Sequence, residues 1–344
     1  MGRQQGVTRW TPSGSVFSSL TKAFPDTLVP LSPNLPSASQ RRTRLAATVV
    51  SLLFATSAHA QDAGWTPLLD EELTEWRTYL SFRHAPGYDG QPPVGHDGRP
   101  LEPVGYDTDP DGVFSVVAEG GEPVLRISGE VYGAAFTRRE FADYHLRLQV
   151  RWGEAKWAPR TDLLRDSGVL YHSVGEAGVD WWRSWMLSQE FQVMEGHMGD
   201  YWNIASSAAD IRAFPPEGDM DPVASVRQPF LPFGSGSPFG GFCLRSVDHE
   251  SPPEAWTTRE LIAVGDRAVH VVNGEVVMVL SGLRAVEDDA TRPMTRGRIQ
   301  LQSEGAEVFY KGVEIRPLDR MPDAYAAYFD EATPEGSPKP PGSL

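Results

Sequence analysis

The sequence predicts an all-β protein built as a sandwich of two antiparallel sheets, and three observations lead to this fold class. Short runs rich in β-branched and aromatic residues recur, no comparably long segment has the 3.6-residue apolar spacing of a helix, and strands do not alternate with helical segments. Many strands separated by turns, without βαβ units, are typical of a two-sheet sandwich. The predicted strands are Val113–Val117, Val124–Ile127, Gly133–Thr137, Tyr144–Trp152, Gly168–His172, Met186–Met194, Leu261–Val264, Val269–Val272, Val276–Leu280, Ile299–Gln302 and Val308–Ile315.

The clearest local prediction is a hairpin centred on Asn273 and Gly274, which separate two apolar runs. Asn-Gly suits the type I′ turn, whose twist matches that of the flanking strands.

Two long segments interrupt the predicted strands. Residues His84–Gly112 and Phe214–Gly241 are rich in Gly and Pro, and loops of this length are usually functional or disordered. We expect them to form rims or lids over a sheet face, with irregular surface excursions as the alternative. The tail Asp319–Leu344 ends in a Pro- and Gly-rich stretch and is expected to be flexible.

Residues 1–60 are predicted to lie outside the folded domain, which we place at residues 61–318. Arg41–Arg44, an apolar run from Leu45 to Ala55, and Ala58-His59-Ala60 have the pattern of a secretory signal peptide cleaved after Ala60. The apolar run is well short of the roughly 20 residues that cross a bilayer, so no membrane span is expected. The Ser-, Thr- and Pro-rich residues 1–40 are unusual before a signal peptide and indicate a translation start assigned too far upstream.

The net charge of the chain restricts the kinds of molecule that it is expected to bind. The formal net charge is −15, and residues 1–60 contain six basic residues and one acidic residue, so their removal would leave −20. An acidic chain of this kind is a poor binder of nucleic acid or anionic membranes, so we expect a neutral or cationic small molecule. The single cysteine, Cys243, excludes an intrachain disulfide, and its apolar neighbours predict plain burial.

The segment Gln189–Trp202 combines a strand pattern with chemically active side chains. Because side chains alternate along a strand, Glu190 and Gln192 share one face while Phe191 and Val193 share the other. If Phe191 and Val193 pack in a core, Glu190 and Gln192 face a groove or solvent. A solvated sheet face is the ordinary alternative.

An ordered series of motifs resembles the 3-keto-disaccharide hydrolase domain family, over roughly Gly64 to Leu318. The motifs are Asp143–Trp152, Asp166–His172, Glu190–Trp202, Gly297–Gln302 and Val308–Ile315. The resemblance implies a concanavalin A-like jelly-roll sandwich, secretion in bacteria, to the periplasm, and action on glycosides whose sugar carries a ketone at C3. The chain departs from the family pattern at Asp166 (often Asn), at His197 (often Asp), and at Ser303-Glu304, where the family often has Asp-His.

A C3 ketone acidifies the C2 hydrogen, so the glycosidic bond can break by proton abstraction, expulsion of the C1 oxygen and later addition of water; direct hydrolysis is the alternative. Elimination needs a base, a stabiliser of the enolate and an acid for the leaving group. We expect Glu190 to act as base or acid, with Gln192 on the same face positioned to hydrogen-bond sugar or enolate oxygens. Glu195 or His197 would take the opposite proton-transfer role.

Substrate-binding candidates surround the same segment. His172 and Lys156 are reserve candidates for polarising the ketone, and His172 is alternatively a structural histidine. Aromatic faces stack on sugar rings, which predicts contacts from Trp185 and Trp202, joined by Tyr171. Asp200 and Gln302 complete the predicted set, and Asp200 alternatively holds the Gly199 turn.

No cofactor is predicted with certainty. Asp162, Asp166, Glu190 and Glu195 are candidates for holding a calcium-like divalent cation, although no loop has regular ligand spacing. The sequence has no HExxH, paired CxxC, P-loop or GxGxxG motif. Two other functions stay open: a non-catalytic carbohydrate-binding module of the same architecture, and a laminin-G-like adhesion domain.

Overall fold

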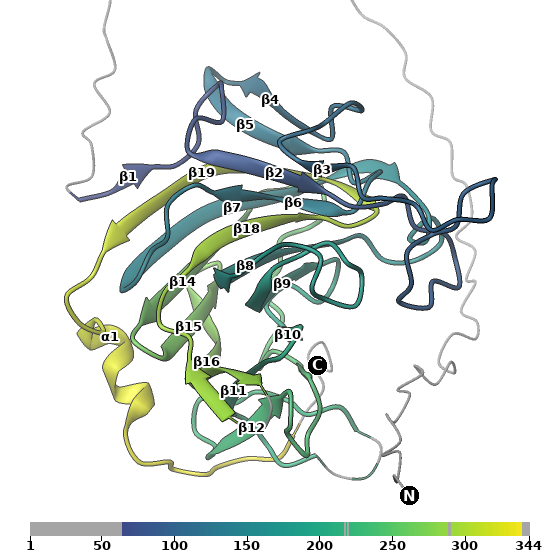
Figure 1. The fold of residues 1–344 in the computed structure, drawn as a ribbon. Coiled ribbons are helices and arrows are strands. Elements are labelled where there is room, and N and C mark those ends of the chain that lie inside the picture. The colour runs from purple at the N-terminus through teal and green to yellow at the C-terminus, as the bar shows by residue number, and fades with distance from the viewer. Residues whose placement is uncertain (1–63, 217, 219, 288–289, 339–344) are drawn as a thin grey trace, which may run out of the picture. The chain divides into compact units, whose positions relative to one another are not determined.

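The computed structural model describes residues 64–216, 218, 220–287 and 290–338, and in this part of the chain two antiparallel sheets pack against each other (Figure 1). The prediction of an all-β jelly-roll sandwich is confirmed. The predicted signal peptide and the upstream residues lie outside the described residues. None of the helices in the described part of the chain is long and apolar enough to cross a membrane.

Among the described residues, the first sheet has eleven strands. Nine of them follow one another across the sheet: β12 (Phe230–Gly234), β11 (Ser207–Arg212), β16 (Glu275–Glu287), β15 (Arg267–Val272), β14 (Thr257–Val264), β7 (Tyr144–Lys156), β19 (Ala306–Pro317), β5 (Glu122–Ile127) and β4 (Phe114–Glu119). The short strands β1 (Thr66–Pro67) and β17 (Ala290–Pro293) pair with β19 and β16.

The second sheet has eight strands within the same described ranges. Their order is β13 (Phe242–Cys243), β10 (Tyr201–Ile204), β9 (Leu187–Met194), β8 (Asp166–Val174), β18 (Arg298–Ser303), β6 (Gly133–Thr137), β2 (Trp76–Leu80) and β3 (Gly105–Tyr106). Its central strands, β9, β8 and β18, carry three of the motifs on which the family resemblance rests.

Apolar side chains from both sheets form the core between them. Phe191 and Val193 of β9 point into it and are at most 1% exposed, so Glu190 and Gln192 point to the outer face of the second sheet. From β14 of the first sheet, Arg259 crosses the core and donates hydrogen bonds to the carbonyls of Gln192 (2.7 Å) and Phe191 (3.1 Å). This arginine fixes the backbone of β9 from behind.

The predicted hairpin is confirmed. Asn273 (φ 48°) and Gly274 (φ 84°) both have positive φ, and Val272 pairs directly with Glu275. Two positive φ angles in a two-residue loop are the geometry of a type I′ turn, which is why Asn-Gly is found here.

The segment His84–Gly112 contains β3 and also contacts the loop between β8 and β9. The ring of Trp182 in that loop lies 5.3 Å from His84 and stacks at 5.0 Å on Tyr88. Trp182 also lies 5.2 Å from Tyr132, next to the outer face of the second sheet. This segment therefore forms a rim over the sheet, one of the two arrangements expected for it.

Part of the predicted tail has defined contacts. Helix α1 (Asp323–Ala326) and the 3-10 helix η1 (Ala327–Phe329) lie beside β14 and β15 (Figure 1). Tyr325 and Phe329 pack on apolar side chains of the outer face of these strands, and Arg212 of β11 donates to the carbonyl of Tyr328 at 2.6 Å. The tail follows the sheet here because its aromatic residues cover an apolar surface.

Candidate functional site

The candidate site lies on the outer face of β9, β8 and β18. Gln192 of β9 is paired with Gly168 of β8, and Glu190 with Leu170. Gln302 reaches the same place from β18 on the other side of β8. Gly168 therefore leaves a gap in the middle of a row of polar side chains.

Glu190 and Gln302 both lean into the space above Gly168. A Cβ atom added to Gly168 would lie 2.3 Å from Oε1 of Glu190 and 2.3 Å from Oε1 of Gln302. No Cβ can approach another heavy atom so closely, so the positions of both side chains depend on a glycine at residue 168.

Several buried polar atoms of this face have no hydrogen-bond partner among the described residues. They are Oε1 of Glu190, Oε1 of Gln192, both amide atoms of Gln302, Oδ1 of Asp166 and the hydroxyl of Tyr132. Buried polar groups are usually paired, and an unpaired one destabilises the fold. Such a concentration on one face indicates a site for a polar ligand.

A second acidic group adjoins Glu190. Arg160, from the loop between β7 and β8, contacts the carboxylate of Asp166 and donates to Oε1 of Glu304 at 3.0 Å. Burial raises the pKa of Glu190 well above its ordinary value, and the charges of Glu304 and Asp166 raise it further. Burial also raises the pKa of Asp166 to about 6, although the Arg160 charge opposes that shift. The site thus contains two carboxyl groups that keep their protons to a higher pH than exposed carboxyl groups do.

Aromatic residues flank Glu190. Trp202 of β10 is half-buried, pairs across the strands with Glu190, and packs against Phe242 with ring centroids 4.6 Å apart. Trp185 is buried over Leu170, next to Glu190 on the other side, and its indole N–H donates to the carbonyl of Gly133 at 2.8 Å. Both predicted tryptophans therefore lie beside the site.

Tyr171 and His172 are not brought together with Glu190. Tyr171 points into the core between the sheets, where its hydroxyl oxygen lies 3.1 Å from Nε2 of His270, within hydrogen-bond distance. His172 is buried with Nδ1 2.8 Å from the carbonyl oxygen of Met294, and burial lowers its pKa to about 4. These contacts are structural, and neither residue reaches the outer face that carries Glu190.

The residues at the end of β9 are engaged in ion pairs. Arg165 donates two 3.0 Å hydrogen bonds to Glu195 and holds the pKa of that carboxyl below its usual value. His197 lies 3.0 Å from Oδ2 of Asp200, whose Oδ1 accepts hydrogen bonds from Arg245.

Lys156, at the end of β7, donates to the carbonyl of Leu163 at 2.7 Å, within the loop that also carries Arg160.

Of the predicted site residues, Glu190, Gln192, Gln302, Trp185 and Trp202 lie together. Glu195, His197, Asp200 and Lys156 are held by other partners, and their predicted roles remain predictions.

The carboxylates predicted to converge on a cation do not form a metal cage in the described part of the chain. There, no three His, Cys, Asp or Glu side chains are arranged to hold a metal ion. Asp166 and Glu195 instead pair with different arginines, Arg160 and Arg165.

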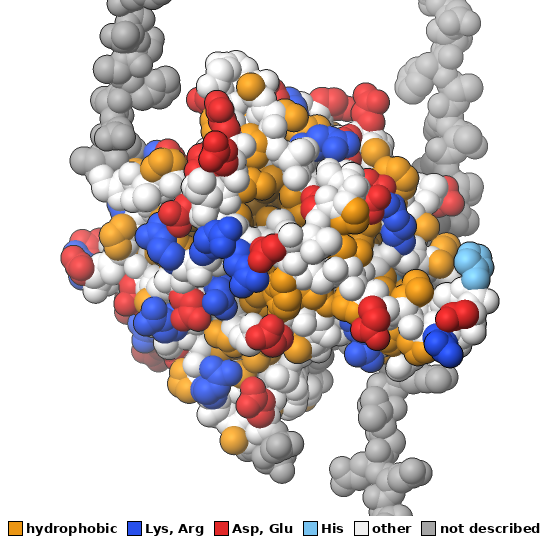
Figure 2. Space-filling view, turned by 45° about the horizontal axis from the view of Figure 1, so that its top comes forward, with side chains coloured by type: hydrophobic (Ala, Val, Ile, Leu, Met, Phe, Trp, Pro, Cys, Tyr) orange, Lys and Arg blue, Asp and Glu red, His pale blue; other side chains and the backbone are white. Residues whose placement is uncertain are grey.

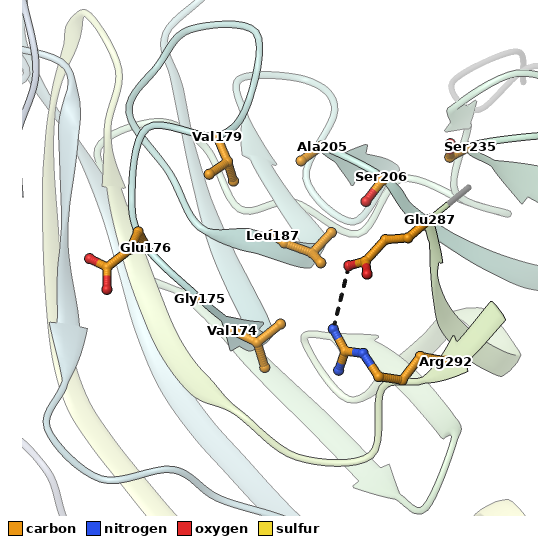
Figure 3. A pocket seen from close by; sticks show the side chains of 10 residues that line it. All are labelled: Val174, Gly175, Glu176, Val179, Leu187, Ala205, Ser206, Ser235, Glu287 and Arg292. Atoms are coloured by element: carbon orange, nitrogen blue, oxygen red, sulfur yellow. Dashed lines mark ion pairs between the residues drawn. The ribbon is translucent and has the colours of Figure 1, made fainter. Parts of the chain in front are cut away.

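A pocket of about 520 Å3 lies at the other end of β8 and β9. Val174 and Leu187, which pair at that end, contribute to its wall, whereas Asp166 and Met194 pair at the end nearer the acidic side chains. Figure 3 shows Glu287 and Arg292, both from the β16–β17 hairpin, facing each other at one side of this pocket, and the two are 3.8 Å apart. The pocket does not include Glu190 or its neighbours.

Arg160, Glu304 and Tyr132 were not predicted as site residues. Glu304 could have been found by extending the two-residue period of β18 from Gln300 and Gln302, because alternate residues of a strand share a face. Arg160 lies in a loop, and no periodic pattern in the sequence places it near Asp166.

The chain is distantly similar to several solved structures. A protein from Parabacteroides distasonis, whose assignment as a glycosyl hydrolase is provisional, is 15% identical, with a TM-score of 0.40 over 74% of this chain and 94% of that chain. A carbohydrate-binding module from Bacillus subtilis is 11% identical, with a TM-score of 0.32 over 59% of this chain and 91% of the module. No curated protein matches the chain.

The comparison with protein families is decisive. Residues 64–316 match the family described as 3-keto-alpha-glucoside-1,2-lyase-like domains. This range includes all the motifs that suggested the family, the three central strands of the second sheet, and the side chains around Gly168. The chain belongs to the family of 3-keto-alpha-glucoside-1,2-lyase-like domains.

Proposed function

We propose that the protein cleaves glycosides whose sugar carries a ketone at C3, with Glu190 transferring a proton at the glycosidic bond. Family membership supports the substrate class. The observation that carries the assignment is that Glu190 shares the space above Gly168 with the unpartnered amide of Gln302. Sugar hydroxyl groups in this space would supply the missing hydrogen bonds.

The reaction begins with loss of the C2 proton, which the neighbouring ketone acidifies. The electron pair of the C2–H bond becomes the enolate, and its collapse forms the C1–C2 double bond as the C1–O bond breaks. The leaving oxygen takes a proton from the enzyme. Water then adds at C1 and a proton at C2, so that the overall outcome is hydrolysis.

Glu190 is suited to donate the proton to the leaving oxygen. Its pKa is raised by burial and by the charges of Glu304 and Asp166, so it holds its proton at a higher pH than an exposed glutamic acid does. Gln192 and Gln302 would bind sugar oxygens beside it, and Trp202 would contact the apolar face of a ring.

Substrate entry requires part of the structure to move. Glu190, Gln192 and Gln302 are at most 5% exposed. The stacked rings of Tyr88 and Trp182 join two loops beside this face, and Trp182 also contacts Tyr132. We expect these two loops to separate when substrate enters.

Parallel assays with a chromogenic 3-keto-glucoside and the ordinary glucoside test the reaction class. We expect release from the keto substrate alone, and reactions with and without a chelator show whether a divalent cation takes part. Binding of either sugar without cleavage would favour a carbohydrate-binding module. Failure to bind or cleave either would favour an adhesion domain.

Glu190→Gln tests the role of the proposed proton donor. With a sugar or methyl leaving group, we expect the rate to fall by about 10²- to 10⁴-fold, the usual contribution of general acid catalysis. A nitrophenolate leaving group needs little protonation, so its release should fall much less. An equal loss with both leaving groups would contradict the donor role.

The chain is also proposed to be secreted, from the signal-peptide pattern of residues 41–60. Expression in a Gram-negative bacterium should give a periplasmic protein whose N-terminal residue is Gln61. Intact-mass measurement checks this, and a cytoplasmic protein that retains residues 41–60 would contradict it.

A further inference from the structure

Arg160 is held in the candidate site by the loop between β7 and β8. The backbone N–H of Trp157 donates to the carbonyl of Gly305 at 2.8 Å, and its indole N–H donates to the carbonyl of Ser128 at 3.1 Å. Gly305 leaves room for the arginine, because a Cβ there would lie 2.8 Å from Cγ of Arg160. The guanidinium group is thus in a fixed position before any ligand binds.

The guanidinium group contacts two carboxylates but leaves part of one of them free. Arg160 contacts Oδ2 of Asp166 and lies 3.0 Å from Oε1 of Glu304, and its side chain is 17% exposed. Oδ1 of Asp166 and the nearby hydroxyl of Tyr132 are buried without a hydrogen-bond partner among the described residues. A proton acceptor and a cation therefore lie next to each other, with unpaired polar atoms around them.

Asp166 also lies on the outer face of the second sheet, near the space above Gly168 that the Glu190 side chain enters. It precedes Gly168 by two residues on β8, so the two residues lie on the same side of the sheet about 7 Å apart. A pyranose ring together with its exocyclic oxygens spans a comparable distance. A ring over Gly168 can thus be reached by Glu190 and by Asp166 from different sides.

The pairing of a base with a cation matches the chemistry of a 3-keto sugar. The proton to be removed is on C2, and the negative charge then develops on the oxygen of the adjacent C3. A base at C2 and a hydrogen-bond donor at the oxygen of the adjacent C3 are therefore needed side by side, and a fixed cation in a water-poor site stabilises such a charge strongly.

We propose that Asp166 and Arg160 form the enolate-generating pair: Oδ1 of Asp166 removes the C2 proton, while the Arg160 guanidinium donates to the C3 oxygen. This inference rests on the proposed function. The C2–H electron pair forms the C2–C3 double bond, and the C3 oxygen becomes anionic beside Arg160. When the C3 carbonyl re-forms, the C1–O bond breaks and Glu190 protonates the departing oxygen.

A 3-keto C-alkyl glycoside isolates this step, because an alkyl group cannot leave from C1 with the electron pair of the C1–C bond. In D2O the wild-type protein should exchange the C2 hydrogen for deuterium, and NMR should show C4, which is also acidified by the ketone, exchanging only at the background rate. Asp166→Asn should reduce C2 exchange by at least about 100-fold. Arg160→Met should reduce it by about 10²- to 10³-fold, as for loss of an oxyanion donor.

Two further variants distinguish a specific loss of C2 exchange from loss of exchange caused by unfolding. Arg160→Lys keeps the charge but not the planar donor group, so it should retain more exchange than Arg160→Met. If Arg160→Met unfolds because two buried carboxylates lose their cation, Arg160→Met with Glu304→Gln removes one of them. Thermal unfolding is measured for every variant.

Arg126→Met is the matched control. Arg126 forms a 2.7 Å ion pair with Glu307 between β5 and β19 of the first sheet, so its loss should leave C2 exchange unchanged.

The two proposals fail in different ways. If folded Arg160→Met and Asp166→Asn proteins exchange C2 at the wild-type rate, the pair is not the enolate-generating machinery, whether or not O-glycosides are cleaved. If the wild-type protein cleaves no 3-keto O-glycoside, the proposed function itself falls.

Discussion

Gly168 lies where two side chains of the candidate site approach the sheet, and its lack of a Cβ has a direct chemical consequence. The carboxyl of Glu190 and the amide of Gln302 occupy the space that any other residue would fill. The backbone φ of Gly168 is not positive, so this glycine is needed for close approach and not for an unusual backbone conformation.

Gly168→Ala should therefore reduce turnover of a 3-keto-glycoside by about 100-fold, because a displacement of about 1 Å at a reacting group can have that effect. Crowding should also lower the free energy of unfolding by about 1 to 3 kcal/mol. Steady-state kinetics and urea unfolding measure the two effects. Gly95→Ala is the control, since its Cβ would meet chiefly the side chains of Leu101 and Asp97. Wild-type turnover by Gly168→Ala would show that Glu190 and Gln302 do not need their present positions.

For single residues, the sequence predicts the direction of a side chain only where residues alternate regularly along a strand. The alternation of β9 correctly predicts that Glu190 and Gln192 share a face opposite Phe191. The same alternation in β8 separates Tyr171 from Gly168, so it could have excluded Tyr171 from the candidates. Arg160 could not be predicted, because the hydrogen bonds that direct it into the site run from Trp157 to residues distant in sequence.

Among elements, the strongly patterned strands are predictable, and strands that contain proline or consist of poor strand formers are not. Each of the predicted strands corresponds to a strand of the structure. β12 was missed because it contains Pro232, which usually argues against a strand. β12 lies at the edge of the first sheet, where a proline is tolerated because no further strand needs a hydrogen bond from the N–H group that Pro232 lacks. β11 was missed because Ala and Asp, which are poor strand formers, occupy most of its centre.

The β15–β16 turn offers a test of element stability, because Asn273 has two functions there. It has a positive φ, and its side chain donates to the carbonyl of His249 at 2.7 Å and accepts from the N–H of Thr258 at 2.9 Å. Asn273→Ala should lower the free energy of unfolding by about 1 to 3 kcal/mol. Asn273→Gly relieves the backbone strain but not the lost hydrogen bonds, so it should fall between wild type and Asn273→Ala. If chemical denaturation finds both variants as stable as wild type, the turn does not limit stability.

Across the whole molecule, the exposed charged residues are of both signs, and the ionisable groups whose pKa values are most strongly shifted are buried. On the face shown in Figure 2, Lys and Arg side chains are interspersed with Asp and Glu. The groups with strongly shifted pKa values lie inside: burial lowers the pKa of His84 and of His172 to about 4, and raises the pKa of Glu190 and Glu304 well above ordinary values. The two histidines reduce the stability of the fold as the pH falls, and the two glutamic acids reduce it as the pH rises.

The signs follow from which state binds more protons. Below pH 6.5 the unfolded chain protonates its histidines, while His84 and His172 in the folded protein stay neutral until about pH 4. Stability due to these residues is therefore present above pH 6.5 and is lost as the pH falls toward 4. The folded protein holds the protons of Glu190 and Glu304 above pH 4.5, where the unfolded chain has released them. Stability due to these carboxyls is present below pH 4.5 and is lost as the pH rises through their raised pKa values.

His172→Asn tests the acid side of this profile, because Asn tolerates the positive φ of 51° at this position and does not titrate. The lost packing lowers stability by an amount that does not change with pH, so the informative quantity is the slope of the difference from wild type. Between pH 6.5 and 4 the variant should recover about 1 to 3 kcal/mol relative to wild type, as expected for a pKa shift of this size. Urea unfolding at half-unit pH intervals measures the slope. A constant difference across this range would mean that His172 accepts a proton as readily in the folded protein as in the unfolded chain, and the acid-side loss would then belong to other groups.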